Sequence, residues 1–139
     1  MSDDTMSIIE FSEDIGDAEA PEPLPVGEYA AIIRSVEGKL SARGTKYAAV
    51  GFHIAPEEFP ADFDPAQAPD GKLIIYRRCS LEDTQQARFM LRKFLENIGA
   101  TASKKIDLND WVGLEARIEV DHDEYEGVMR EQITRVNAA

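Results

Sequence analysis

A chain of 139 residues with 43% hydrophobic and 30% charged residues has the size and composition of one globular domain, which excludes fibrous and fully disordered proteins. No apolar run approaches the roughly 20 residues of a membrane-spanning helix, and Asp3 and Asp4 stand where a secretory signal would be basic. Cys79 is the only cysteine, so no disulfide forms within the chain, which favours the reducing cytoplasm.

The net charge of −12 is unevenly distributed along the chain. Residues 1–23 hold eight acids and no base, so 19 of the 27 acids remain against all 15 bases in residues 24–139. The acidic segment ends in the proline-rich run 21–25, which is typical of extended chain. We therefore expect an acidic flexible tail over residues 1–23 and a single domain over residues 24–139.

Three strands are predicted in the first part of the domain. Residues 27–36 and 46–54 are rich in β-forming residues and flank the turn-like segment 38–44, so they are expected to form a hairpin. Residues 55–71 contain four prolines and indicate a long surface excursion. The third strand is expected over residues 72–80.

Alternation within the second strand separates two faces of the sheet. Val50, Phe52 and Ile54 share one face, which is expected to be the core face. The opposite face is expected to carry the alternate residues Tyr47, Ala49, Gly51 and His53.

One helix is predicted after the third strand. Asp83 is its expected N-cap, Gln86 completes a capping box, and Gly99 provides the stop. Six apolar residues recur at helical spacing and are expected to pack against a sheet: Ala87, Met90, Leu91, Phe94, Leu95 and Ile98.

Two further strands are predicted after a polar connector. Residues 114–121 alternate between apolar and charged side chains, and residues 125–127 turn the chain into a last strand over 128–136. Three strands, a helix and two strands is the element order of the oligonucleotide- and oligosaccharide-binding (OB) barrel. We therefore expect a mostly β (α+β) fold, a five-stranded OB-like barrel with one amphipathic helix between strands three and four.

Five short motifs are found between about residues 24 and 136. They are Pro-Leu-Pro-Val-Gly-Glu-Tyr at 23–29, Lys-Tyr at 46–47, Phe-Met-Leu-Arg-Lys-Phe-Leu-Glu-Asn-Ile-Gly at 89–99, Trp-Val-Gly-Leu at 111–114 and Tyr-Glu-Gly at 125–127. In these motifs the chain resembles a family of phage-encoded OB-fold single-stranded-DNA-binding proteins, formerly described only as a domain of unknown function. The resemblance implies DNA binding without sequence specificity during phage replication or recombination, in the host cytoplasm.

Single-strand binding needs aromatic rings on which bases stack and cations that follow the backbone. The first three strands and their loops supply both kinds of residue. The candidate nucleic-acid-binding residues are Lys39, Arg43, Lys46, Tyr47, His53, Lys72, Tyr76 and Arg78. Tyr76 and Arg78 are expected to share a face of the third strand, with Arg77 on the other. The alternative is that the tyrosines pack in or beside the core with arginines lying over them.

Sequence motifs for catalysis or metal binding are absent. Residues 121–124 read Asp-His-Asp-Glu, but Tyr125 and Glu126 stand where an EF-hand loop needs an oxygen ligand and glycine, which favours a solvated hairpin turn. Cys79 is interpreted as a small core residue, and Trp111 as a core residue with base stacking as its alternative. We therefore expect a binding protein, not an enzyme, with no cofactor and no metal.

Two other functions stay open. One is a protein-binding or virion-associated module that uses the acidic tail, and the other is an acidic DNA mimic. For the tail itself, we expect competition with DNA for the basic groove and recruitment of replication or recombination proteins. Its alternatives are a solubility segment, or a strap docked on the core through Ile8, Ile9 and Phe11.

Overall fold

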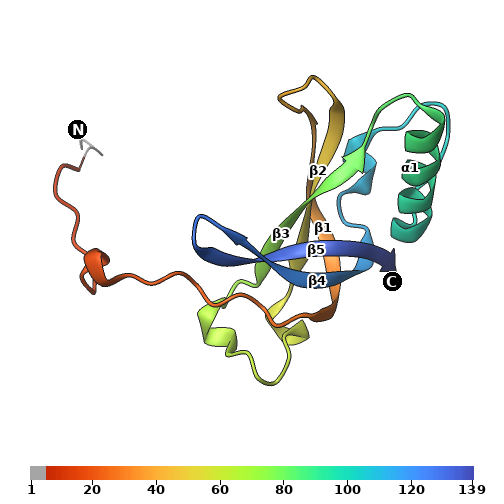
Figure 1. The fold of residues 1–139 in the computed structure, drawn as a ribbon. Helices are drawn as coiled ribbons and strands as arrows, with labels where there is room; N and C mark the ends of the chain where they lie inside the picture. The colour runs from red at the N-terminus through yellow and green to blue at the C-terminus, as the bar shows by residue number, and fades with distance from the viewer. Residues whose placement is uncertain (1–5) are drawn as a thin grey trace, which may run out of the picture.

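The computed structural model describes residues 6–139 as a curled sheet with one helix beside it (Figure 1). The strands are β1 (Gly27–Leu40), β2 (Lys46–Ile54), β3 (Lys72–Ser80), β4 (Glu115–Tyr125) and β5 (Val128–Ala138), and the helix is α1 (Gln85–Ile98). Short 3-10 turns are η1 (Ile15–Asp17), η2 (Pro56–Glu58), η3 (Pro65–Gln67) and η4 (Leu108–Trp111). The predicted mostly β fold with five strands and one helix is confirmed. Within residues 6–139, no helix combines the length and apolarity needed to cross a bilayer.

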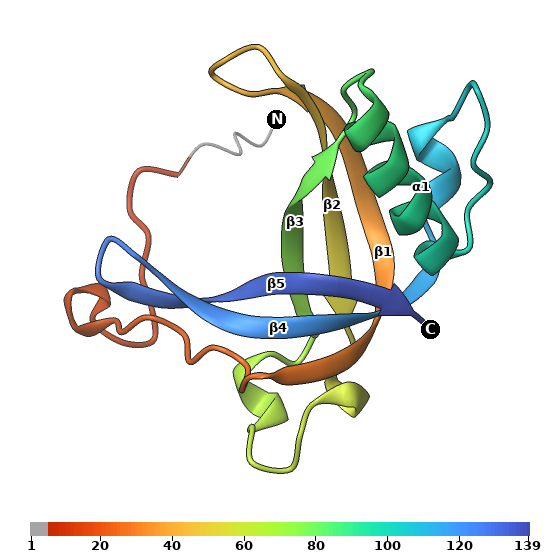
Figure 2. The same ribbon diagram turned by 45° about the vertical axis from the view of Figure 1, so that its right-hand side comes forward.

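The five strands form one antiparallel sheet in the order β3-β2-β1-β4-β5, and this sheet is open. Its edge strands β3 and β5 share no hydrogen-bonded ladder in the described part of the chain. They face each other across a cleft of about 380 Å³ lined mainly by residues 73–78 and 130–133. Figure 2 shows β4 and β5 crossing over β1, β2 and β3. A curled open sheet thus stands where a barrel was expected.

The core lies between the concave face of the sheet and the C-terminal half of α1. Val50, Phe52 and Ile54 are fully buried, as the alternation in β2 predicts. The helix contributes Phe94, Leu95 and Ile98 to the same cluster. Met90 was expected in this stripe but is 57% exposed, because the N-terminal half of α1 stands over a groove instead of the core.

The ends of α1 show one correct and one wrong prediction. Thr84, not Asp83, is the N-cap, because its backbone is extended and its Oγ1 accepts a hydrogen bond from the Ala87 N–H at 3.1 Å. Asp83 pairs with Arg88 instead. Gly99 ends the helix with a positive φ of 79°, a conformation that glycine adopts without strain, as expected.

The β4–β5 hairpin is longer than the sequence indicated. Its turn consists of Glu126 and Gly127, both with positive φ, which matches the right-handed twist of the two strands. Residues 121–124 lie within β4 and pair with residues 129–132 of β5. The prediction that they form the turn itself is therefore wrong, since pairing across the two-residue turn extends the ladder through them.

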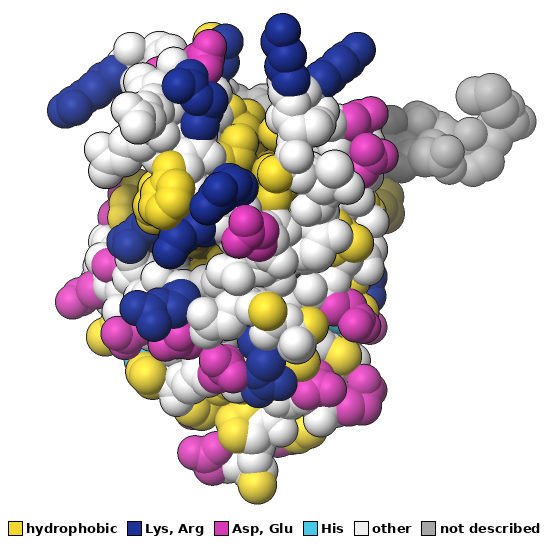
Figure 3. All heavy atoms as spheres, turned by 90° about the vertical axis from the view of Figure 1, so that its right-hand side faces the viewer, with side chains coloured by type: hydrophobic (Ala, Val, Ile, Leu, Met, Phe, Trp, Pro, Cys, Tyr) yellow, Lys and Arg dark blue, Asp and Glu magenta, His cyan; other side chains and the backbone are white. Residues whose placement is uncertain are grey.

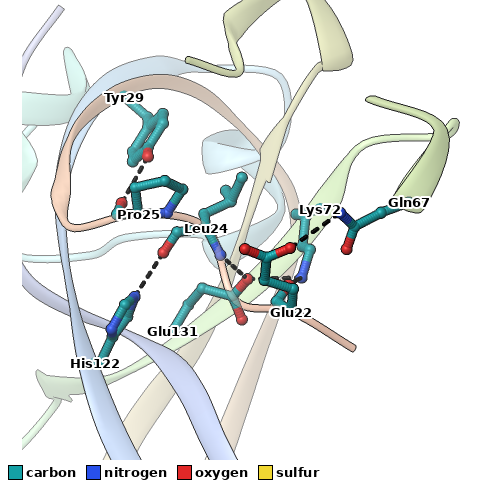
Figure 4. Close-up of polar contacts among 8 residues, drawn as sticks. All are labelled: Glu22, Leu24, Pro25, Tyr29, Gln67, Lys72, His122 and Glu131. Atoms are coloured by element: carbon teal, nitrogen blue, oxygen red, sulfur yellow. Dashed lines mark hydrogen bonds and ion pairs between the residues drawn. The ribbon is translucent and has the colours of Figure 1, made fainter. Parts of the chain in front are cut away.

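The segment that leads into β1 is bound to the sheet by a polar cluster (Figure 4). The Leu24 N–H donates to Glu131 Oε2 at 2.9 Å, and the Leu24 carbonyl accepts from His122 Nε2 at 2.7 Å. Lys72 Nζ lies 2.8 Å from Glu131 Oε2 and donates to the Glu22 carbonyl at 3.0 Å. Leu24 itself is fully buried. Side chains from β3, β4 and β5 therefore hold residues 22–24 in place, and the Tyr29 hydroxyl of β1 donates to the Pro25 carbonyl at 2.6 Å.

The rest of the described tail does not contact the core. Ile8, Ile9 and Phe11, the residues of the alternative in which the tail is a strap docked on the core, are exposed. Only the C-terminal end of the described tail is attached to the domain, through backbone hydrogen bonds and the buried Leu24 side chain. Residues 6–20 extend away from the domain (Figure 1).

The Lys72–Glu131 pair predicts a pH-dependent stability. Burial alone would raise the pKa of Glu131, but hydrogen bonds from Lys72 and the Leu24 N–H and the lysine charge hold that pKa below its ordinary value. Such a carboxyl stabilises the fold above its unfolded pKa of about 4.3, and the contribution is lost as pH falls through the lowered folded pKa. We expect Glu131→Gln to reduce the free energy of unfolding by about 1–3 kcal/mol at pH 7 and by much less near pH 3.

Denaturant unfolding at the two pH values measures this difference. Glu124→Gln, at an exposed position of β4, is the matched control and should change stability little at either pH. If Glu131→Gln lowers the free energy of unfolding by the same amount at both pH values, the role assigned to the ion pair is contradicted.

Candidate nucleic-acid interface

The folded domain carries opposite charges on two sides. Residues 37–46 and 77–111, here called the basic side, comprise the β1–β2 hairpin, the end of β3, α1 and the connector to η4. They contain ten bases and six acids, a charge of +4, whereas the remainder of residues 24–139 contains five bases and thirteen acids, a charge of −8. In Figure 3, Lys and Arg side chains gather over the upper part of the face around apolar side chains. The fold therefore concentrates cations that the sequence disperses.

Strand register brings a tyrosine and cations together on the outer face of the basic side. Tyr47 pairs with Lys39 on one neighbour and with Ser80 on the other. Directly opposed residues in antiparallel strands have Cβ atoms about 4.5–5.5 Å apart, so Lys39 lies beside Tyr47. Tyr47 is partly exposed, and the Lys39 ammonium forms an exposed ion pair with Glu37 at 3.5 Å.

A bulge in β3 adds two arginines to this surface. Ala48 pairs with Cys79 and Val50 with Tyr76, so Arg77 and Arg78 both stand opposite the single residue Ala49. Both arginines are exposed. The side-chain set Lys39, Arg43, Lys46, Tyr47, Arg77 and Arg78 is called the hairpin patch below. It holds five of the eight predicted residues, together with Arg77, which was expected on the opposite face.

The same bulge separates Tyr76 from Arg78, so the prediction that they share a face is wrong. Tyr76 points inward with Val50, and its ring stacks on Phe94 at 5.9 Å between centroids with an interplanar angle of 10°. Burial raises the pKa of the Tyr76 hydroxyl. The structure therefore supports the alternative of a tyrosine packed beside the core.

Two more predicted residues are engaged at the other end of β2 and β3. His53 Nε2 donates to the Asp70 carbonyl at 2.7 Å. Lys72 is only 16% exposed and is held by Glu131 and the Glu22 carbonyl. These contacts join the surface excursion and the tail to the sheet, so His53 and Lys72 lie apart from the hairpin patch.

The cleft between β3 and β5 is a feature that sequence reasoning missed. Arg77 and Arg78 line it from β3, and Arg130 and Asp123 line it from the β4–β5 hairpin. The Arg130 guanidinium lies 4.5 Å from the ring centroid of Tyr125, which is 55% exposed. A second aromatic side chain and a third arginine are thus near the patch, from strands some 50 residues further along the chain.

A groove between β3 and α1 adjoins the patch on its other side. It measures about 410 Å³ and is lined by apolar side chains of both elements, with Arg78 and Glu82 among its polar residues. On the exposed surface of α1, Arg92 and Lys93 lie over the ring of Phe89 at 5.4 and 5.3 Å. The helix therefore contributes both apolar and basic surface.

Cys79 and Trp111 are both buried in the core. Cys79 is buried, and burial raises the pKa of its thiol to about 12, so the thiolate needed of a nucleophile does not form near neutral pH. Trp111 is 1% exposed and packs on Phe94 at 5.6 Å, which leaves it no face for a base. Among residues 6–139, no group of three or more His, Cys, Asp or Glu side chains is placed to hold a metal ion.

Comparison with models of known protein families and with curated proteins found no match to this chain.

The positions of the two tyrosines predict decreases in stability of different size. Tyr76→Ala removes a ring packed between β3 and α1 and should lower the free energy of unfolding by about 2–3 kcal/mol. Tyr47→Ala lies on the outer face and should cost less than about 1 kcal/mol. Urea unfolding of both variants tests whether Tyr76 is packed and Tyr47 lies on the outer face. Equal decreases in the free energy of unfolding would contradict this assignment.

Proposed function

We propose that this protein binds single-stranded DNA without strong sequence preference, through the hairpin patch and the cleft between β3 and β5. The single observation that carries this proposal is the charge distribution: a chain with a net charge of −12 gathers a charge of +4 on one side of its fold. Phosphate neutralisation by Lys and Arg supplies most of non-specific nucleic-acid affinity. An apolar partner would not require these cations beside exposed aromatic rings.

The arrangement of the sheet supports this proposal. We interpret the curled sheet as an open form of an OB-like barrel, which pairing of β3 with β5 would close. OB barrels are partly open five-stranded barrels that bind oligonucleotides on strands two and three and on the loops between strands one and two and between four and five. Here the equivalent surfaces are β2, β3 and the two hairpins that carry the hairpin patch, Tyr125 and Arg130.

The proposed division of labour follows from the chemistry of the side chains. Bases stack on Tyr47 and on Tyr125, because every base has a π-face and such stacking tolerates any sequence. Phosphates contact the cations of the patch and Arg130, which position the strand without reading it. No catalytic step is part of this function. Its proposed setting is phage replication or recombination in the host cytoplasm.

The role of the arginines can be tested by charge reversal. Arg77→Glu with Arg78→Glu should weaken binding to oligo-dT at least about tenfold at low salt, and should reduce the slope of log K against log salt by about 0.7 for each phosphate left without its cation. Mobility-shift or fluorescence titrations over a salt series provide the measurement. The matched control is Arg34→Glu with Arg135→Glu, which makes the same charge change at exposed residues outside the basic side.

The proposal requires that the control double variant binds oligo-dT with an affinity close to that of the parent chain. Equal weakening of both double variants would mean that total charge, not the patch, governs affinity. No binding to oligo-dT by the parent chain at low salt would overturn the proposed function itself.

Base stacking on Tyr47 is a separate expectation. Tyr47→Ala should weaken oligo-dT binding by about 5- to 150-fold, the value of about 1–3 kcal/mol for one stacked base. Tyr47→Phe keeps the ring and should retain most of the affinity. Because the ring lies outside the core, melting temperatures should stay similar. If the alanine and phenylalanine variants bind alike, Tyr47 is not a stacking platform.

A second candidate function is protein binding by the acidic tail. The observation that favours it is the exposure of Ile8, Ile9 and Phe11, since an acidic segment that served solubility alone would not need large apolar residues. Replication or recombination proteins are the proposed partners. The same tail is proposed to compete with DNA for the basic side.

A further inference from the structure

The groove between β3 and α1 is a largely apolar surface into which no segment of residues 6–139 packs. Tyr76, Leu91 and Phe94 form part of its wall, and Met90 projects beside it with 57% of its surface exposed. Phe94 is buried at the bottom, whereas Leu91 is only partly covered. An amphipathic helix normally covers such residues against its own sheet. The groove therefore has the form of a docking site for an extended apolar segment.

The surroundings of the groove are basic. Arg78 lines it from β3, and Arg88, Arg92 and Lys93 are exposed on α1 outside the lining of the groove. Asp83 and Glu96 pair with two of these arginines, but the side chains are more than half exposed, so the pairs are weak and readily exchanged. With Glu82 as the acid that lines the groove, the local field still favours an acidic occupant.

The tail of the same chain has the complementary chemistry. Between residues 6 and 20, Ile8, Ile9, Phe11 and Ile15 are 62–82% exposed, and the segment contains five acids and no base. The turn η1 is already formed there, because the Asp14 carboxylate accepts a hydrogen bond from the Gly16 N–H at 2.8 Å. Extended over residues 8–15, the segment spans about 26 Å, close to the length of about 21 Å expected for α1.

The place where the tail leaves the domain decides which groove it occupies. Residues 22–24 are fixed to β3, β4 and β5, and in both ribbon views the tail runs out on the side away from α1 (Figures 1 and 2). Donor segment and acceptor groove thus face in opposite directions on one molecule. A contact of this kind is heterologous and links successive copies head to tail.

We propose that residues 8–15 of one copy bind in the groove between β3 and α1 of a second copy. Ile8, Ile9 and Phe11 enter the apolar part of the groove, and the tail carboxylates lie along the cations of α1. Arg78 lines both this groove and the cleft proposed for DNA, so a bound tail and a bound strand would compete for this arginine. The contact between copies does not depend on the proposed DNA binding and can be measured without DNA.

Sedimentation velocity of the full chain over a range of concentrations tests the proposal. We expect dimers and larger species to grow with concentration at low salt and to dissociate partly at about 1 M salt, where the Debye length falls to about 3 Å. A tail variant with Ile8, Ile9 and Phe11 changed to Ser should weaken association at least about tenfold. A groove variant, Met90→Glu with Lys93→Glu, should do the same, because Lys93 lies three residues after Met90 and adjoins it on the helix surface.

All substituted residues are exposed, so melting temperatures should match that of the parent chain. If the groove variant unfolds, Met90→Ser alone replaces it. Met129→Glu with Arg135→Glu makes the same charge change at exposed positions of β5 and should associate normally.

Mixing the two variants gives the decisive measurement. The tail variant retains an intact groove and the groove variant an intact tail, so each alone should stay monomeric while the mixture forms a one-to-one dimer. A monomeric mixture would overturn the proposal. A parent chain that is monomeric at all concentrations would overturn it too. If the tail of that monomer contacts its own groove, the tail binds within one molecule and not between copies.

Discussion

The long strand β1 is the constraint on which the rest of the structure depends. Residues 27–32 of β1 pair with β4, and residues 32–40 pair with β2, so the two halves of one strand belong to two different ladders. A register shift between Ile33 and Ser35 lies just beyond the point where the ladders meet. Bulges bend and twist a strand, so the sheet curls about this point. The curl brings the far edges β3 and β5 face to face.

The curl also determines where charge accumulates. It places the β1–β2 hairpin, the end of β3 and α1 on one side, and the excursion and most of the acids on the other. The proposed binding surface is therefore a product of topology, since the arginines from β3 and from the β4–β5 hairpin are distant in sequence. The acids on the opposite side, among which Tyr125 is also exposed, are the surface that the alternative of an acidic DNA mimic would use.

The polar cluster around Leu24 has a structural role that cannot be deduced from its residue types. A lysine, a histidine and a glutamate on three strands would ordinarily be ascribed to a solvated surface or a ligand site. Here Lys72, His122 and Glu131 instead satisfy the backbone groups of residues 22–24. Their position at the exit of the tail gives the tail a defined direction, and the contact proposed between copies depends on that direction.

The sequence by itself determined the strands and helix of this protein, because alternation in β2 and β4, the helical stripe and Gly99 are local signals that act within a few residues. It also identified the cations of the β1–β2 hairpin and Tyr47. Only the tertiary structure decided the bulge at Arg77 and Arg78, the inward position of Tyr76, the engagement of Lys72 and the exposure of Met90. Each of these depends on which strand or helix lies opposite, and cross-strand register and packing are set by partners far away in the chain.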